Sequence, residues 1–293
     1  MLPLVTIVTP SYNQGRFIRA TIESVLKQDY PRIEYLIIDG GSTDETVSIL
    51  REYPDRLRWV SEPDHGQAHA INKGWRQARG SILAYLNSDD LYLPGAVAQA
   101  VAALDAHPAA AAVYGEGYHV DEEGRILERY PTEPFHADRL QETCFICQPT
   151  VFLRRDAVER VGYLGESLRY CMDYDLWIRL ARAGKILIHT PHYLASTRLH
   201  ADTKTLGQRG PAHAEILQVV HRHFGRVAPR LVYGHAHAVL GLQNRDPSSL
   251  DRLALIAISL VTFLRYNWSV PRSAWALWWQ WLRDSMREAL AGR

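Results

Sequence analysis

The sequence predicts an α/β protein with a doubly wound, mostly parallel sheet, a mixed second half and a C-terminal helical extension. Apolar strand patterns alternate with amphipathic helix patterns from the first residue to about residue 114, and such alternation is typical of a parallel sheet. Strand and turn patterns follow, and from about residue 206 the pattern becomes helical. We therefore expect a first domain over residues 1–205, with halves at about 1–115 and 116–205, and a helical extension over 206–293.

The individual elements follow from the spacing of the apolar residues. Short apolar runs between turn residues predict strands at 4–9, 35–39, 57–61, 82–86 and 111–114. Recurrence every three to four positions predicts helices at 17–27, 44–53, 68–78 and 94–104. Ser42 and Glu45 have the spacing of a capping box for the second of these helices. A hairpin is expected next, with strands at 117–120 and 125–130.

Composition and charge exclude several classes of protein. The chain has 293 residues and a formal net charge of +1, so no basic excess favours nucleic acid as a partner. The three cysteines form an odd number, and the apolar start of the chain is too short for a signal peptide, so we expect a cytoplasmic protein. Cys144 and Cys147 have redox spacing, but no second pair completes a zinc site, and we interpret them as packed thiols.

The expected strand at 82–86 ends in Asn87-Ser88-Asp89-Asp90, an amide followed by two adjacent carboxylates. Ligands of open α/β sheets bind beyond the carboxyl ends of the strands. Hard oxygen ligands suit Mg²⁺ or Mn²⁺, so this position predicts a divalent metal beside a nucleotide diphosphate. The alternative is a solvated turn of the same composition.

Polar loops follow the other three early strands as well, at 9–13, 39–44 and 61–66. Gly41 and Gly66 allow a ligand to approach the backbone closely, and Asp39 and Asp64 can accept hydrogen bonds from a nucleobase imide or a ribose hydroxyl. Each loop alone is compatible with a plain turn. The chain has neither a Gly-x-Gly-x-x-Gly motif after the first strand nor a Walker lysine loop, which disfavours dinucleotide and P-loop chemistry.

Five motifs in order resemble family 2 glycosyltransferases of the GT-A fold, over about residues 3–205. They are Thr9-Pro-Ser-Tyr-Asn13, Asp39-Gly-Gly-Ser-Thr-Asp44, Pro63-Asp-His-Gly66, Asn87-Ser-Asp-Asp90 and Met172-Asp-Tyr-Asp-Leu-Trp177. The resemblance implies a UDP-, GDP- or dTDP-linked sugar donor, Mg²⁺ or Mn²⁺ as cofactor, and inversion at the anomeric carbon. The chain departs from the family at Asn87, where the usual metal motif Asp-x-Asp has its first aspartate.

The resemblance also implies roles for matched residues. Asp89 matches the metal-binding carboxylate, and Asp173 matches the general base that deprotonates the acceptor hydroxyl. The alternative for Asp173 is a cap of the helix expected at 173–183. His200 would complete the metal coordination or donate to the pyrophosphate, and Lys204 would neutralise it, unless both are solvated loop residues. The residues expected to bind the nucleotide sugar are Thr9, Pro10, Tyr12, Asn13, Asp39, Gly41, Ser42, Asp64, Gly66, Asn72, Asn87, Ser88, Gln148 and Lys204. Gln148 has the alternative of an exposed loop amide.

The tail is rich in tryptophan and arginine. The apolar run at 253–264 is too short for the ~20 residues of a spanning helix, so we expect a core or interfacial helix. Tryptophans 268, 275, 278, 279 and 281 follow among several arginines, a composition typical of a helix at the level of lipid headgroups. The sequence thus favours peripheral membrane contact through residues 253–287. The alternative is a helix that packs on the catalytic domain or on a second subunit in a homodimer.

Together these features predict a metal-dependent, inverting glycosyltransferase at the inner face of the cytoplasmic membrane. Its acceptor would be a hydroxyl of a glycan or lipid-linked glycan in surface polysaccharide synthesis. One alternative is a nucleotidyltransferase, although residues 10–15 lack the glycine-rich, basic triphosphate loop expected there. Another is an inactive sugar-nucleotide binding module, against which Asp89 and Asp173 argue.

Overall fold

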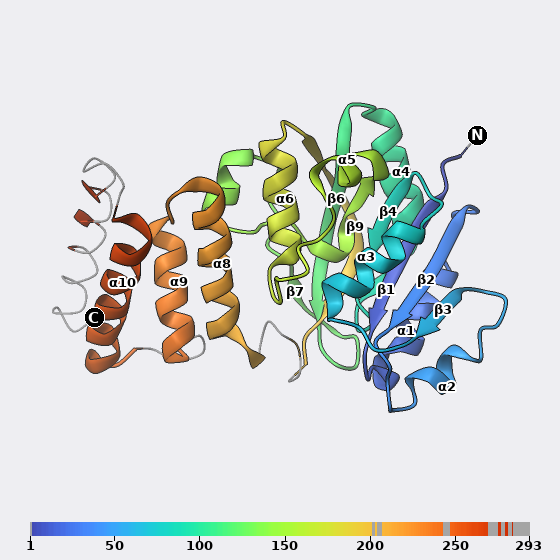
Figure 1. Cartoon of the computed structure of the whole chain (residues 1–293), viewed down its shortest axis with the longest axis horizontal. Helices are drawn as coiled ribbons and strands as arrows, with labels where there is room; N and C mark the ends of the chain where they lie inside the picture. Colours follow the sequence, from blue (N-terminus) through green and yellow to red (C-terminus); the bar gives the residue numbers. More distant parts are fainter. Residues whose placement is uncertain are drawn as a thin grey trace. The chain divides into compact units, whose positions relative to one another are not determined.

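The computed structural model describes residues 2–200, 203, 207–242, 247–268, 275–276, 279–280 and 283. Lys204 and most of the tryptophan-rich tail lie outside the described residues. The chain divides into two compact units, of which unit 1 comprises residues 1–136 and 145–200, and unit 2 comprises 137–144 and 201–293. Figure 1 shows that unit 1 combines a sheet with helices and that unit 2 is helical.

One sheet forms the frame of unit 1, and nine strands of the described chain belong to it. They are β1 (Val5–Ser11), β2 (Ile33–Asp39), β3 (Arg58–Ser61), β4 (Ile82–Tyr85), β5 (Leu91–Tyr92), β6 (Ala110–Val120), β7 (Ile126–Arg129), β8 (Phe152–Arg154) and β9 (Ile186–Arg198). Their order is β3-β2-β1-β4-β8-β6-β9-β5, with β7 paired to β6. The first four strands are parallel, whereas β8 runs antiparallel to both of its neighbours. The predicted parallel half and mixed half are thus confirmed.

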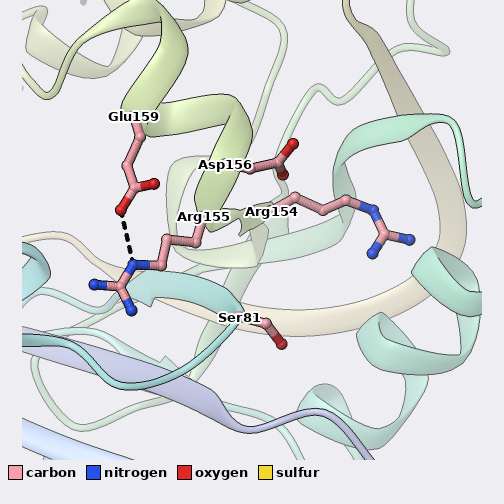
Figure 2. A pocket seen from close by; sticks show the side chains of 5 residues that line it. All are labelled: Ser81, Arg154, Arg155, Asp156 and Glu159. Atoms are coloured by element: carbon pink, nitrogen blue, oxygen red, sulfur yellow. Dashed lines mark hydrogen bonds and ion pairs between the residues drawn. The ribbon is translucent and has the colours of Figure 1, made fainter.

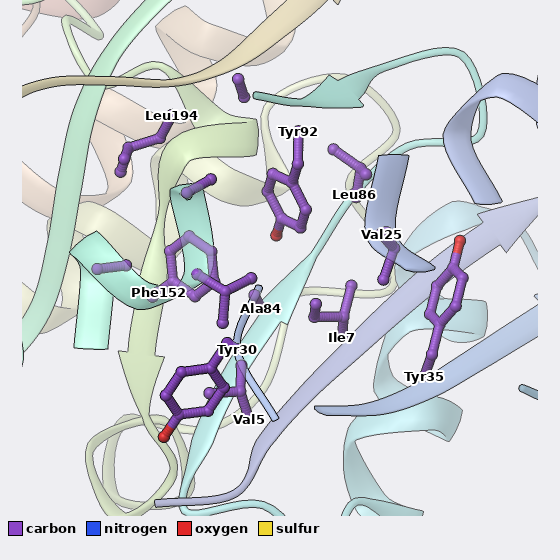
Figure 3. Close-up of a cluster of buried hydrophobic side chains, with 14 of the residues drawn as sticks. Val5, Ile7, Val25, Tyr30, Tyr35, Ala84, Leu86, Tyr92, Phe152 and Leu194 are labelled. Carbon is purple, nitrogen blue, oxygen red and sulfur yellow. The ribbon is translucent and has the colours of Figure 1, made fainter. Parts of the chain in front are cut away.

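Helices cover both faces of this sheet, as expected for a doubly wound fold. They are α1 (Gly15–Leu26), α2 (Thr46–Leu50), α3 (Gln67–Gln77), α4 (Ala96–Ala106), α5 (Arg155–Val161) and α6 (Met172–Arg182). Successive side chains of a strand point to opposite faces. Ile7 of β1 therefore joins a core cluster with Val25 of α1 and with residues of α4 (Figure 3). Val8 faces α3, where a Cβ added at Gly74 would lie 2.6 Å from Val8 Cγ1.

Two details of the predicted elements are wrong, each for a tertiary reason. The capping box does not form, because the Ser42 hydroxyl donates to Asp39 Oδ1 at 2.5 Å and α2 begins only at Thr46. The strands expected at 111–114 and 117–120 are one continuous strand, β6. Its glycines permit close packing, since a Cβ at Gly117 would lie 2.6 Å from Cys147 Sγ. Cys147 is buried, in keeping with a packed thiol.

Unit 2 contains helices α8 (Arg209–Phe224), α9 (Pro229–Leu240) and α10 (Ser249–Asn267). Ser248 and Asp251 form a capping box at the start of α10. The unit also contains a group of histidines, called here the histidine trio: His213, His235 and His237. Burial lowers the pKa of each of these imidazoles. No helix in the described part of the chain is long and apolar enough to cross a membrane.

Helix α10 has an unusual distribution of polarity. Its buried residues include Ser259, Thr262 and Asn267. Its exposed positions are apolar except for Ser249 and Arg265. We call the apolar ones the outer stripe: Leu250, Leu253, Ala257, Val261 and Trp268. Leu250 is 79% exposed and Trp268 is 77% exposed, so large apolar side chains of this helix face solvent.

Candidate active site

The loops after β1 and β2 are bound to each other. The backbone N–H of Asn13 donates to Ser42 Oγ at 2.7 Å, and Asn13 Oδ1 accepts from the backbone N–H of Thr43 at 2.8 Å. Asp44 Oδ2 accepts from the backbone N–H of Gly15 at 2.8 Å. Burial raises the pKa of Asp44, but its hydrogen bonds from Thr46 and Gly15 outweigh burial, and the net shift is downward. The structure thus brings Asn13 and Ser42 together, as the strand-end prediction requires.

Asp39, at the end of β2, is fully buried and its carboxylate binds neighbouring loops. Oδ2 accepts from the backbone N–H of Ser42 at 2.9 Å and from Ser61 Oγ at 2.6 Å, and Oδ1 accepts from Ser42 Oγ. Oδ2 also accepts from the backbone N–H of Gly41 at 3.2 Å. The described contacts of Asp39 therefore hold the loops after β2 and β3 in place.

The remaining residues of the first three loops differ widely in exposure. Thr9 is buried, with its hydroxyl 3.1 Å from that of Tyr35, and Pro10 is buried beside it, whereas Tyr12 is 61% exposed. Asp64 Oδ1 accepts from the backbone N–H of Gly66 at 2.7 Å, and Gly66 has a φ of 111°, which favours glycine. Asp64 also lies against the loop after β2, because a Cβ at Gly40 would be 2.9 Å from Asp64 Oδ2.

Three amide side chains meet at the end of β4, and we call them the amide triad: Gln67, Asn87 and Gln148. Asn87 Oδ1 accepts from Gln67 Nε2 at 2.7 Å, and Asn87 Nδ2 lies 3.3 Å from Gln148 Oε1. Gln148 Nε2 donates to the carbonyl oxygen of Tyr85 at 3.0 Å. These two contacts attach the Gln148 side chain to the end of β4 and the loop that follows it. An amide in an exposed loop would not need such contacts.

Asn87 also donates to the buried carboxylate of Asp90, at 3.1 Å from Nδ2 to Oδ2. The other oxygen of Asp90 accepts from the backbone N–H of Arg198 at 3.1 Å. Burial and then the charge of Asp89 raise the pKa of Asp90, and the hydrogen bonds from Arg198 and Asn87 act against them. Asn87 therefore supplies a donor where the family's usual aspartate would bring another negative charge.

The two residues predicted as metal ligands lie side by side. His200 Nε2 is 3.1 Å from Asp89 Oδ2, and the imidazole packs on the Phe17 ring with centroids 4.8 Å apart. The Asp89 side chain is 20% exposed, whereas that of His200 is 4% exposed, so the carboxylate is open on one side. Ser88, which directly precedes Asp89, is buried, and its carbonyl accepts from Thr21 Oγ1 at 2.9 Å. Within the described residues, no three His, Cys, Asp or Glu side chains form a metal-binding group.

Asp173 lies in the first turn of α6 and is partly buried. The N-cap of that helix is Cys171, without a side-chain cap, so capping does not account for Asp173. Asp175 has a structural contact, because it accepts from Arg179 Nε at 2.8 Å. Arg179 in turn donates to the carbonyl of Tyr163 at 2.8 Å, which holds the segment before α6.

Asn72 is 1% exposed and its amide binds the same segment. Nδ2 donates to the carbonyl of Leu164 at 2.9 Å and to Glu166 Oε1 at 2.8 Å, and Oδ1 accepts from the backbone N–H of Leu164 at 3.0 Å. These contacts join α3 to the chain that leads into α6. Asn72 therefore holds protein segments together in this structure, whereas the sequence predicts a contact with the donor.

A pocket of about 270 Å³ lies at the amino-terminal end of β4, whereas this site lies at the carboxyl end of that strand (Figure 2). It is lined by Ser81, Arg154, Arg155, Asp156 and Glu159. Arg155 donates to Glu159 at 2.9 Å, and Arg154 donates to the carbonyl of Ala110 at 2.9 Å. Its arginines thus already bind protein groups, and the pocket adds no chemistry to the site at the strand ends.

Sequence reasoning assigned no role to two contributors to the site, Gln67 and Arg198. Gln67 is the first residue of α3, and Arg198 is the last residue of β9. Arg198 precedes His200 by only two positions, and this closeness in sequence to a predicted metal ligand is the signal that could have found it. Gln67 follows Gly66 directly and had no comparable signal.

Comparison with known proteins decides the family. Residues 6–162 match the family described as Glycosyl transferase family 2. The chain belongs to glycosyl transferase family 2. The family and enzyme class expected from the sequence are therefore confirmed, and the matched residues include the loops after β1 to β4.

Several curated relatives are glycosyltransferases. An uncharacterised glycosyltransferase of Rickettsia prowazekii is 28% identical over 211 residues, covering 69% of this chain and 66% of the relative. A chondroitin synthase of Escherichia coli is 30% identical over 186 residues, covering 62% of this chain and 27% of the relative. A hyaluronan synthase of Pasteurella multocida is 27% identical over 229 residues, covering 77% of this chain and 23% of the relative. The chain thus spans from about two thirds to about a quarter of the length of these proteins.

Solved structures share the fold. S. aureus TarS residues 1–349 in complex with UDP-GlcNAc has a TM-score of 0.67 at 17% identity, covering 98% of this chain and 87% of that one. A mannosyltransferase from Pyrobaculum calidifontis in complex with GDP-Man and Mn²⁺ has a TM-score of 0.57 at 22% identity, covering 99% of this chain and 87% of that one. The GT-A fold predicted from the sequence is confirmed.

Proposed function

We propose that this family 2 glycosyltransferase is metal-dependent and inverting. It transfers a sugar from a nucleotide-diphospho-sugar to a hydroxyl of a glycan or lipid-linked glycan, in the synthesis of a surface polysaccharide. The observation that carries this proposal is the contact of Asp89 with His200, 3.1 Å apart at the edge where four polar loops end. Relatives named as synthases of chondroitin and hyaluronan support a glycan acceptor. Similar structures with UDP-GlcNAc and with GDP-Man and Mn²⁺ support the donor class and the metal.

The donor set at this edge fits a divalent cation. In sites that bind phosphates, Mg²⁺ keeps several waters and takes only one or two carboxylates from the protein. The partly exposed carboxylate of Asp89 and the imidazole of His200 would supply two protein ligands, which is a number of this order. A bound Mg²⁺ or Mn²⁺ would neutralise negative charge on the departing diphosphate. Asp89 and His200 are therefore the residues we assign to hold it.

The chain's own residues supply the other functions. The loops after β1, β2 and β3, joined by Asn13, Asp39 and Asp64, form the surface for the nucleoside. Asp173 lies in the first turn of α6. Its carboxylate accepts the proton of the acceptor hydroxyl as that oxygen attacks the anomeric carbon from the face opposite the leaving diphosphate. A single displacement of this kind inverts the configuration.

We assign donor binding to residues 1–115, acceptor binding to 116–205, and a separate attachment role to the extension at 206–293. The outer stripe of α10 supports peripheral membrane contact within residues 253–287, because the apolar side chains of Leu253, Val261 and Trp268 are exposed there. Arg252 and Arg265 are basic residues of the same helix. Membrane contact would bring the active site to a lipid-linked acceptor. A homodimer that covers the stripe is the competing explanation.

The direct test is donor binding with and without Mn²⁺. Calorimetry with UDP, GDP and dTDP and their common sugar conjugates should identify one nucleotide whose affinity increases with Mn²⁺. Asp89→Ala should remove that increase while leaving the melting temperature close to that of the native protein. Asp55→Ala, at an exposed position away from the strand ends, is the matched control. Metal-independent binding of every nucleotide by the native protein would contradict the proposal.

A further inference from the structure

We propose that Arg198 is a positioning residue that couples the turn between β6 and β7 to the loop that carries Asp89. The proposal rests on the proposed function, because it assigns Asp89 to the metal. Two segments matter here. The metal-site loop comprises residues 87–90, and the β6–β7 turn comprises residues 121–125.

The side chain of Arg198 donates to both segments at once. Nε donates to the carbonyl of Asp89 at 3.0 Å. Nη1 donates to the carbonyls of Asp121, at 3.2 Å, and Glu122. Arg198 is 5% exposed, so these bonds are formed away from bulk water. A buried cation that binds backbone carbonyls of two separate segments fixes the distance between them.

The backbone around Arg198 strengthens the same connection. Its N–H donates to the buried carboxylate of Asp90 at 3.1 Å, and the next residue, Leu199, donates to the carbonyl of Val120 at 2.8 Å. The end of β9 thus joins the metal-site loop and the strand that leads into the β6–β7 turn. His200, which contacts Asp89, follows directly and is held by the same strand end.

Arginine is the residue type that this geometry requires. Its planar guanidinium presents five donors in a fixed fork, so one side chain can bind carbonyls in two directions. The group also lies 5.0 Å from the centroid of the Phe17 ring, and Phe17 packs on His200 as well. Lysine has one ammonium group and cannot bind both segments with the same geometry.

The consequence concerns the position of Asp89 rather than its chemistry. Without the Arg198 side chain, the carbonyl of Asp89 loses its donor and the β6–β7 turn loses its direct side-chain link to the metal-site loop. The carboxylate would then sample several positions beside His200, and metal affinity would decrease. Because the turn belongs to the half we assign to the acceptor, Arg198 also makes the position of that turn depend on metal and donor.

The test compares Mn²⁺ binding in the native protein, Arg198→Lys and Arg198→Met, measured by electron paramagnetic resonance without nucleotide and again with UDP or GDP. The matched control is Arg16→Met. Arg16 also binds the turn, through the Glu122 carboxylate, and also lies over Phe17, at 4.9 Å, but its described contacts do not include the metal-site loop. We expect both Arg198 variants to bind Mn²⁺ at least about tenfold more weakly, and Arg16→Met to stay within about twofold of the native protein.

Native-like Mn²⁺ affinity in a folded Arg198→Lys protein would overturn the proposal, as would equal losses in Arg16→Met and Arg198→Met. If neither Arg198 variant folds, hydrogen exchange of the native protein decides. Addition of Mn²⁺ and nucleotide should then slow exchange at residues 121–125 as well as at 87–90, and unchanged exchange at 121–125 would refute the coupling. Failure of the native protein to bind Mn²⁺ at all would instead contradict the proposed function.

Discussion

Replacing Asn87 with aspartate would restore the family's usual Asp-x-Asp motif, yet we expect it to destabilise this protein. Asn87 Nδ2 donates to Asp90 Oδ2 at 3.1 Å and lies 3.3 Å from Gln148 Oε1. Asp90 is 2% exposed, and its other oxygen is already bound by the Arg198 backbone. An ionised aspartate has no donor, so two carboxylates would face each other where an amide and a carboxylate now meet.

The expected size of the effect follows from these contacts. A hydrogen bond to a charged group contributes about 1.5–3 kcal/mol. Two unit charges at this separation would repel by about 5 kcal/mol at an effective dielectric constant of about 20, so one carboxyl group would take up a proton instead. We therefore expect the free energy of unfolding to fall by about 2 kcal/mol or more, which lowers the melting temperature by about 4–8 °C in a domain of this size.

The assay is thermal unfolding of the native protein, Asn87→Asp and Asn87→Ala, each with a chelator and with excess Mn²⁺. Mn²⁺ should restore part of the stability of Asn87→Asp, because a cation offsets the added carboxylate. It should not do so for Asn87→Ala, which loses the same donor without gaining a charge. If Asn87→Asp melts at or above the native temperature in chelator, the reasoning about Asp90 is wrong.

Three further outcomes are expected. Asp173→Asn should keep nucleotide affinity and lower sugar transfer by about 10²-fold, the usual scale for loss of a general base, and near-native transfer would assign the base to another residue. Burial lowers the pKa of each member of the histidine trio below the ordinary value of about 6.5, so the unfolded chain binds more protons. The stability of unit 2 that is present above about pH 6.5 should therefore be lost as the pH falls, and urea unfolding at about pH 7.5 and about pH 5.5 measures this. Leu253→Ser combined with Val261→Ser should weaken binding to anionic vesicles by about tenfold, whereas Leu127→Ser, at an exposed position of unit 1, should not, and equal vesicle binding by all proteins would contradict membrane contact.

The fold class followed from the sequence because strand and helix periods are local. The alternation from β1 to β4 survives in the structure nearly unchanged, since β1, β2 and β4 are buried and the helices between them pack apolar residues on the sheet. The exception is β3, which is only partly buried. Strand β5 has two residues, which is too short to show any period, and it forms only because Leu91 and Tyr92 pair with β9. The predicted capping box does not form, because the Ser42 hydroxyl donates to Asp39 in the same loop and accepts from the backbone N–H of Asn13, 29 residues away.

The site was predictable where a motif fixes a residue's position and not where distant segments converge. Asp89 and His200 are 111 positions apart, and the family pattern nevertheless indicated both. Arg198 was not predicted, because its function depends on the carbonyls of a turn that folds against β9 from elsewhere in the chain. The contacts of Asn72 could not be predicted for the same reason, since its amide binds the carbonyl of Leu164, 92 residues away.

The hydrogen bonds that join the loops after β1 and β2 have a kinetic consequence. Because Asn13, Ser42 and Asp44 form these bonds during folding, the backbone entropy of the loops is lost then and not when a nucleotide arrives. The nucleoside would meet a surface that already has its final shape. Nucleotide association should therefore give single-exponential traces in stopped-flow measurements, with a rate that increases linearly with nucleotide concentration and shows no plateau from a slow rearrangement.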